Sequence, residues 1–290
     1  MRWRRLHNPG LPVSLTLAGL ELEAFSISGL ATYVLVPALD ACFDLGHCGV
    51  EAARLDHVFL SHVHQDHAGG VHRHLSLRAM TGARPPRIYC PAESAEALRD
   101  LLRAWARLEG KDPAGVGDVV VPVRPGDRLA LGRGRTVEAF DVTHRIASRG
   151  YTVVERARAL LPAWQGRPAA EVSAAVRRGE AVHAEAERRR LTYIGDSTIE
   201  TLEQRPEVSD CDVLLMEATH LPGTDVATAR RYGHTHLDEL VALFARAPEA
   251  LAARQIVLKH FSLKYREDDV ARALAALPEG LRERVTMLAP

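Results

Sequence analysis

The chain has 290 residues, 47% of them hydrophobic, so it can bury a substantial core and is still short enough to form one large domain. Its 37 Lys and Arg residues balance its 37 Asp and Glu residues, so net charge provides no general attraction for nucleic acid. The four cysteines form no CxxC pair, so neither a disulfide framework nor a thiolate zinc site is indicated, and a cytoplasmic location is expected. No stretch approaches the ~20 apolar residues that span a bilayer, so no membrane association is expected.

The amino-terminal part predicts short strands that end at Gly, Pro or Asp. These expected strands span Leu15 to Leu22, Ala31 to Val36, Ala41 to Asp44 and Val58 to Leu60. The last of them ends directly at Ser61. Side chains that follow the carboxyl end of a strand sit in a rigidly held loop, which is where the sites of α/β proteins tend to lie.

The rest of the chain alternates between strand and helix patterns. Strands are expected at Arg87 to Cys90, Val119 to Val123, Thr136 to Val142, Leu191 to Ile194, Val213 to Met216 and Gln255 to Leu258. Helices are expected at Ala92 to Leu108, Leu237 to Ala247 and Asp268 to Leu277. Such alternation indicates sheets covered by helices, in a single domain spanning 1–290.

Residues 155–190 differ in composition from the rest of the chain. They are rich in Ala, Arg and Glu and contain few large apolar residues. The segment is therefore expected to project from the core as an insert. A charge run of this kind is usually a solvated helix face, although its arginines could also contact phosphates.

The motif SHVHQDHAGG at 61–70 indicates a metal site. Zinc prefers imidazole and carboxylate donors, and this run places three imidazoles and one carboxylate within six residues. His62 and His64 can turn to the same side of an extended segment, while Asp66 and His67 beyond the turn can face a second metal.

Three later residues, each just after an expected strand, complete a ligand set: His144, Asp196 and His260. We expect one zinc to be held by His62, His64 and His144, the other by Asp66, His67 and His260, with Asp196 bridging the two. Two metals ~3.5–4 Å apart can share a hydroxide, lower its pKa and stabilise the entering and leaving oxygens of a phosphodiester. A di-iron redox site is disfavoured because a carboxylate would then be expected in place of one histidine.

Seven stretches resemble the metallo-β-lactamase superfamily and, within it, the ribonuclease Z family in its short, plant-type form. They are CFDLG at 42–46, the 61–70 motif, THRIASRGY at 143–151, GDST at 195–198, MEAT at 216–219, YGHTH at 232–236 and HFSLKY at 260–265. The last two are much more particular to ribonuclease Z than to other members of the superfamily.

The resemblance implies an αββα sandwich of two β-sheets with helices outside and a dinuclear zinc site at one edge. It implies an endoribonuclease that removes the 3′ trailer from precursor tRNA, usually as a homodimer in which one subunit's arm serves the other's site. His234 looks like the catalytic histidine, paired with Glu217, and Asp66 looks like a residue that binds metal and activates water. Segment 155–190 is then a candidate for that arm, although it lacks a clear Gly-Pro motif.

Two other functions stay open. A small-molecule hydrolase could act on thioesters, lactones or cyclic phosphodiesters through the same metals, and a non-catalytic RNA-binding protein could have kept the fold. The sequence also leaves Mn²⁺ and Fe²⁺ as alternatives to zinc. We interpret His47, His57, His72, His74 and His183 as structural or exposed, leave His236 unassigned, and take the three tryptophans mainly as packing residues, with Trp164 the one worth testing as a base-stacking platform.

Overall fold

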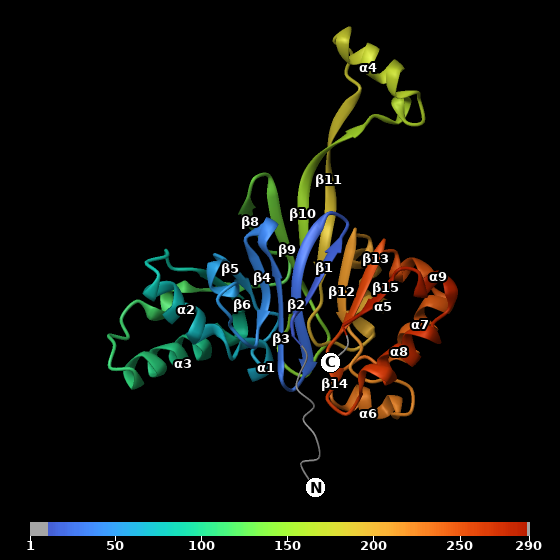
Figure 1. Ribbon diagram of the computed structural model, residues 1–290. Helices are drawn as coiled ribbons and strands as arrows, with labels where there is room; N and C mark the ends of the chain where they lie inside the picture. The colour runs from blue at the N-terminus through green and yellow to red at the C-terminus, as the bar shows by residue number, and fades with distance from the viewer. Residues whose placement is uncertain (1–10, 289–290) are drawn as a thin grey trace.

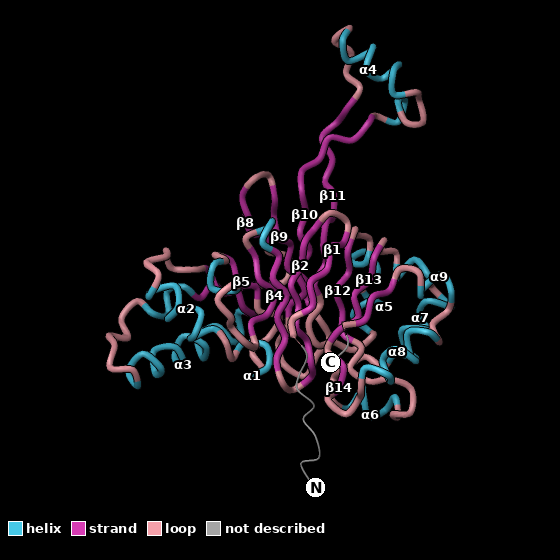
Figure 2. Tube along the Cα trace, viewed as in Figure 1, coloured by secondary structure: helices cyan, strands magenta, loops and turns pink. Residues whose placement is uncertain are grey.

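Two β-sheets lie face to face in the computed structural model, which describes residues 11–288 (Figure 1). Helices cover the outer side of each sheet, and a long hairpin projects from one end of the sandwich (Figures 1 and 2). This arrangement agrees with the αββα sandwich expected from the sequence. Among the described residues, no helix has both the length and the apolar character needed to cross a membrane.

The first sheet has the order β1-β2-β3-β4-β5-β6-β7, and β14 pairs with β2. Its strands are β1 (Val13–Leu17), β2 (Leu20–Ser28), β3 (Ala31–Val36), β4 (Ala41–Leu45), β5 (His57–Phe59), β6 (Arg87–Pro91), β7 (Val120–Val123) and β14 (Phe261–Ser262). Strands β1 to β4 are antiparallel neighbours, whereas β4 to β7 run parallel. The carboxyl ends of the parallel strands therefore meet at one edge, where the loop after β5 carries the histidine motif.

The second sheet has the order β15-β13-β12-β11-β10-β9-β8. Its strands are β8 (Arg128–Gly132), β9 (Arg135–Asp141), β10 (Arg149–Leu160), β11 (His183–Tyr193), β12 (Val213–Glu217), β13 (Gln255–Lys259) and β15 (Val285–Met287). All five residues of β12 are buried. A strand that is parallel to both neighbours and covered on both faces is expected to be apolar throughout, so the charged Glu217 at its end is an exception.

Helices form the two outer layers. Beside the first sheet lie α1 (Gln65–Ala68), α2 (Val71–Met80) and α3 (Ala95–Leu108); beside the second lie α5 (Glu200–Gln204), α6 (Val226–Arg231), α7 (Leu237–Arg246), α8 (Glu267–Ala275) and α9 (Glu279–Arg282). Helix α3 buries Leu98, Leu102 and Ala106 at helical spacing against the sheet. One cluster of buried side chains lies between the two sheets. A second lies between the first sheet and its helices, and a third lies between the second sheet and its helices.

The hairpin of β10 and β11 extends beyond the sheet and carries α4 (Ala169–Arg177) at its tip (Figure 1). The strands pair continuously from Tyr151 opposite Tyr193 to Leu160 opposite His183, with one bulge at Val153/Val154. Most of the arginine run, including Arg156 and Arg188, therefore lies on strands and not on the solvated helix that its composition favours. At the tip, Ala175 and Val182 are buried, so α4 packs against its own loop.

One expected strand was wrong. Leu15 to Leu22 is two antiparallel strands joined at Ala18 and Gly19, both of which have positive φ. Ala18 adopts the left-handed region that favours glycine, so its residue type gives no turn signal. The other expected strands and helices lie where the sequence places them, with shifts of a few residues at their ends or longer strands at the hairpin.

Candidate metal centre

The loop after β5 places its histidines beneath the edge of the sandwich. Leu60 continues the strand by donating from its N–H to the Tyr89 carbonyl, and α1 begins after His64. His62 and His67 are completely buried. A Cβ at Gly46 would lie 1.9 Å from the Asp66 carbonyl oxygen, so only glycine lets the turn after β4 approach this loop.

The structure brings the seven predicted ligands together in two neighbouring groups, and a third set that overlaps them consists of Asp196, His234 and His260. His62, His64, His144 and Asp196 place one donor atom each within 4.8 Å of one another, and so do Asp66, His67 and His260. Asp196 Oδ2 lies 3.8 Å from His62 Nε2, while its Oδ1 lies 3.2 Å from His67 Nε2 and 3.3 Å from His260 Nε2. Asp196 thus reaches both groups.

His260 connects the two sheets at the site. It stands between β13 of the second sheet and β14 of the first, with φ of 65°. A non-glycine residue in this region costs about 1 kcal/mol or more and persists where the surroundings hold it. The strained turn directs the imidazole back toward His67, whose Nε2 lies 3.2 Å from His260 Nε2.

Four histidines direct their Nδ1 atoms to acceptors in the protein. His62 faces Ser61 Oγ at 3.0 Å, His67 faces Asp44 Oδ2 at 2.7 Å, His144 faces the Gly233 carbonyl at 2.8 Å and His260 faces Thr219 Oγ1 at 2.9 Å. An imidazole that donates from Nδ1 presents a lone pair on Nε2, which is the arrangement that metal-binding histidines adopt.

The donor set therefore fits metal ions. The Nε2 atoms of His67 and His260 lie 3.2 Å apart, and either a proton or a metal ion is needed where two such lone pairs meet. Buried His144 Nε2 and Asp196 Oδ1 have no hydrogen-bond partner among the described residues. Burial alone would lower the pKa of His67, but the carboxylates of Asp196 and Asp44 raise it to about 10. The same negative field that attracts a proton attracts a metal ion.

Asp44 supports the histidine loop from below. Its buried carboxylate accepts hydrogen bonds from the Ser61 N–H at 2.6 Å, the Ser61 hydroxyl at 2.8 Å and the Tyr193 hydroxyl at 2.6 Å, in addition to His67. A Cβ at Gly195 would lie 2.2 Å from Ser61 Oγ, so this network also requires a glycine before Asp196. Ser61 and Tyr193 thus join both sheets beneath the metal ligands.

Glu217 and His234 form a pair beside the ligands. Glu217 Oε1 lies 2.7 Å from His234 Nδ1 and accepts the Ser197 N–H at 2.9 Å, while its Oε2 accepts from the Thr219 N–H and hydroxyl. Burial would raise the pKa of Glu217, but His234 outweighs it and the pKa is lowered. Burial would lower the pKa of His234, but Glu217 raises it to about 9. The Glu217 carboxylate thus favours the protonated form of the His234 imidazole.

Comparison with known proteins decides the family. A model of the β-lactamase superfamily domain matches residues 39–261. Ribonuclease Z of Bradyrhizobium sp. (strain ORS 278) is 31% identical over 251 residues, which cover 79% of this chain and 80% of that protein. The chain belongs to the ribonuclease Z family of the β-lactamase superfamily. The resemblance inferred from the sequence motifs is confirmed.

Other members of the family and its superfamily match over nearly the whole chain. The tRNase Z TRZ1 of Arabidopsis thaliana is 29% identical over 278 residues, covering 95% of this chain and 97% of that protein. Among solved structures, the metallo-β-lactamase fold protein YhfI from Bacillus subtilis covers 93% of this chain and 97% of its own with a TM-score of 0.60 and 16% identity. Human tRNase Z, short form, covers 97% and 94% with a TM-score of 0.52 and 19% identity. These structural likenesses confirm the fold.

Several residues of this ribonuclease Z-type site were not singled out from the sequence. Asp44 lies in a stretch that looked unspecific. The hydroxyl groups of Thr219 and Tyr193 give no signal in the sequence, because most Thr and Tyr hydroxyls have no role at a functional site. A charged residue inside an apolar strand, as Asp44 is in ACFDL, is the signal that could have identified one of them, because such a group is costly to bury unless it is paired.

Several other histidines among residues 11–288 lie outside these donor groups. His74 donates from Nε2 to the carbonyls of Ala52 and Leu55, the His72 ring contacts the Trp105 ring at a tilt, and His57 stacks on Tyr89. His236 caps α7, with its Nδ1 accepting the Asp238 N–H at 3.1 Å. These contacts give His74 and His236 structural roles.

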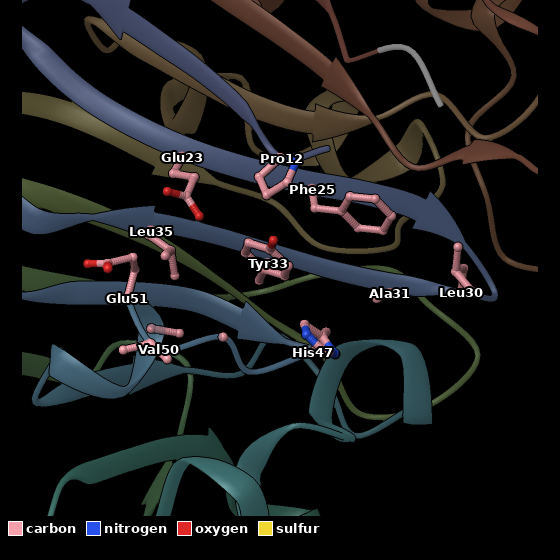
Figure 3. A pocket seen from close by; sticks show the side chains of 13 residues that line it. Pro12, Glu23, Phe25, Leu30, Ala31, Tyr33, Leu35, His47, Val50 and Glu51 are labelled. Atoms are coloured by element: carbon pink, nitrogen blue, oxygen red, sulfur yellow. The ribbon is translucent and has the colours of Figure 1, made fainter. Parts of the chain in front are cut away.

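A pocket of about 510 Å³ opens on the outer face of the first sheet, next to the histidine loop that follows β5 (Figure 3). Phe25, Tyr33 and His47 form a row along its floor, with ring centroids 6.0 Å and 6.5 Å apart. The loop beyond Phe25 contacts the candidate metal centre, because the Gly29 N–H donates to Asp66 Oδ2 at 2.8 Å. The pocket therefore adjoins the second ligand group.

Proposed function

We propose that this chain is a zinc-dependent endoribonuclease that removes the 3′ trailer from precursor tRNA. The observation that carries the proposal is the combination of a two-metal ligand set with the Glu217–His234 pair beside it, in a chain that belongs to the ribonuclease Z family. Relatives named tRNase Z support the substrate. The four buried, unpaired thiols fit the cytoplasmic location proposed here.

We propose that the donor groups divide between two metal ions. His62, His64 and His144 would hold one zinc, Asp66, His67 and His260 the other, with Asp196 between them. Two bound zinc ions would supply Lewis-acid chemistry at a phosphodiester and ease the deprotonation of water. Mn²⁺ or Fe²⁺ could occupy the same donors, although the imidazole-rich set suits zinc.

Asp66 is suited to receive a proton from the attacking water. Its Oδ2 accepts the Gly29 N–H at 2.8 Å and lies 3.5 Å from His260 Nε2. Burial would raise the pKa of Asp66, but the bond from His260 and the charge of His67 lower it to about 2. Asp66 is therefore ionised at neutral pH and is fixed in place by the backbone of the β2–β3 turn.

His234 is suited to protonate the leaving 3′ oxygen. Glu217 holds its Nδ1, so the proton on Nε2 faces the ligand groups. Four donors fix Glu217, and with its carboxylate unable to rotate the imidazole has one orientation. The product tRNA would then end in a 3′-hydroxyl.

The projecting hairpin is a candidate RNA-binding arm. It carries exposed arginines on its strands, and at its tip Arg167 lies over the Trp164 ring at 4.7 Å. Because the tip projects from the end of the sandwich opposite α1, it is suited to contact a second region of a large substrate (Figure 1). In a homodimer, which we also propose, the arm of one subunit would serve the site of the other.

The competing function is hydrolysis of a small ester through the same metals. The pocket of about 510 Å³ beside the histidine loop is of a size that holds a small molecule, which favours testing this alternative.

The experiment that separates the two functions starts from zinc-loaded protein. It is incubated with precursor tRNA carrying a 3′ trailer, beside a His64→Ala control, and the cut is mapped. Cleavage after the discriminator nucleotide, absent in the control, is expected. Turnover of small phosphodiesters or thioesters without RNA cleavage would favour the small-molecule function.

A further inference from the structure

A second pocket, of about 900 Å³, lies at the opposite end of the first sheet from the histidine loop. It is formed where β4, β5 and β6 begin and where the turn between β8 and β9 reaches over them. The histidine loop follows the carboxyl end of β5, whereas His57 at its amino end lines the pocket. In Figure 1, α1 marks one end of this sheet and the β8–β9 turn the other.

The lining of this pocket is strongly basic. It contains five arginines, namely Arg54, Arg84, Arg87, Arg133 and Arg135, and two aspartates, Asp40 and Asp56. The lining residues therefore carry three more positive than negative charges, in a chain whose formal charges cancel, and two of the arginines pair with carboxylates outside the lining, Arg54 with Glu51 and Arg135 with Glu155. Such a local patch is what a polyanion site requires when net charge provides no attraction.

A buried arginine beneath the pocket partly neutralises the negative charge of one of its two aspartates. Arg78, which is 3% exposed, pairs with Asp56 from below, so the charge of Asp56 is shared between this buried arginine and Arg84 at the surface. Arg87 and Arg133 are exposed and form no ion pair with any carboxylate among residues 11–288. Both guanidinium groups are therefore available to a ligand.

The basic pocket is continuous with the root of the hairpin. Arg135 donates from Nη1 to the Ala38 carbonyl at 2.8 Å and from Nε to Glu155 at 2.9 Å, where β10 leaves the sheet. The Arg156 N–H donates to the Gly134 carbonyl at 3.0 Å, next to Arg133. Exposed Arg133 at the pocket thus lies close along the backbone to exposed Arg156 on the first strand of the hairpin.

We propose that this basic pocket binds phosphate groups of the RNA backbone, as a contact separate from both the metal centre and the hairpin tip. The inference rests on the proposed RNA substrate. A guanidinium presents paired N–H donors that match two oxygens of a phosphate, and arginines on separate elements suit phosphates along a chain. The open pocket at the hairpin root favours an extended polyanion over a small one.

The test uses an Arg87→Gln/Arg133→Gln double variant, since these two side chains have no carboxylate partner to lose. An Arg107→Gln/Arg282→Gln variant removes the same charge from exposed positions outside the pocket lining. Binding of labelled precursor tRNA is measured by fluorescence anisotropy at several salt concentrations in EDTA, so that cleavage plays no part. Loss of two phosphate contacts is expected to reduce the slope of log Kd against log salt by about 1.4 to 1.8, with weaker binding than the control.

Cleavage kinetics of the zinc-loaded variants provide a second readout. The pocket variant is expected to raise KM for precursor tRNA and to leave kcat and the hydrolysis of a small phosphodiester unchanged. A salt slope equal to that of the control would overturn the proposal. A second result would also overturn it. If RNA binding is unchanged in the pocket variant, and pyrophosphate raises the melting temperature of the wild type and the control but not of the pocket variant, then the pocket binds small anions and not RNA. If the wild-type protein neither binds nor cleaves precursor tRNA, the proposed function itself fails.

Discussion

Asp44 shows how one buried carboxylate can position a metal site that it does not enter. It receives four hydrogen bonds and fixes the tautomer of His67. In an Asp44→Asn variant, an NH₂ group replaces one carboxylate oxygen. It then faces the groups of Ser61, His67 and Tyr193 that need an acceptor. Zinc affinity is expected to fall by about 10- to 100-fold, as for other residues that orient metal ligands. Competition with a chromophoric chelator measures this, with Asp118→Asn at an exposed position as the control; equal affinities in both variants would contradict the assigned role.

The role of His234 predicts a loss of rate without a loss of metal. A His234→Ala variant is expected to cleave precursor tRNA about 10²- to 10⁴-fold more slowly, because a positioned general acid contributes this much. Its zinc content should equal that of the wild type, since Glu217 and not the predicted ligand set holds its Nδ1. Metal analysis of the purified variant separates the two effects. A variant that had lost zinc would place His234 among the ligands instead.

His74 predicts a pH dependence of stability that is independent of the metal centre. It is completely buried, and burial together with Arg78 lowers its pKa to about 4. The unfolded chain therefore binds the proton more readily, and the free energy of unfolding falls as pH drops below about 6.5. Between pH 7.5 and 5 this group is expected to cost ~2 kcal/mol. Urea unfolding in EDTA should show a correspondingly smaller loss for His74→Gln; an equal loss would rule out this contribution.

At the scale of elements, the hairpin predicts a separation of RNA binding from chemistry. Leu160 and His183 are paired, so replacing residues 161–182 with Asn-Gly closes the hairpin with a two-residue turn and leaves the sheet intact. The shortened protein should hydrolyse a small phosphodiester within about twofold of the wild-type rate, while its KM for precursor tRNA rises about tenfold or more. Unchanged KM would remove the tip from the RNA-binding surface.

The elements also show where local pattern is sufficient. The expected strand Ala31 to Val36 matches β3, because a short run of apolar and β-branched residues that ends at a proline is typical of a buried strand. The pattern was insufficient at Ala18, where an ordinary residue adopts a left-handed turn, and along 155–190. There, Ala, Arg and Glu favour a helix by intrinsic propensity, but pairing between β10 and β11 imposes strands.

For the molecule as a whole, the sequence identifies the predicted ligand residues but not the residues that hydrogen-bond to them and orient them. Histidines and aspartates after strands carry a signal in their residue type and spacing. The contacts that orient them join positions far apart, as between Asp44 and Tyr193 or Thr219 and His260, and depend on how the two sheets face each other. The same holds for the basic pocket, since its arginines come from three separate segments.

We propose that metal-activated water, and not the 2′-hydroxyl of the RNA, cleaves the RNA beside this ligand set. End-group analysis of the tRNA fragment, released by apoprotein titrated with zinc, tests it most directly. We expect a 3′-hydroxyl end whose yield rises with added zinc up to two equivalents per protein chain and which is absent for His64→Ala. A 2′,3′-cyclic phosphate end, or full cleavage without added metal, would contradict it.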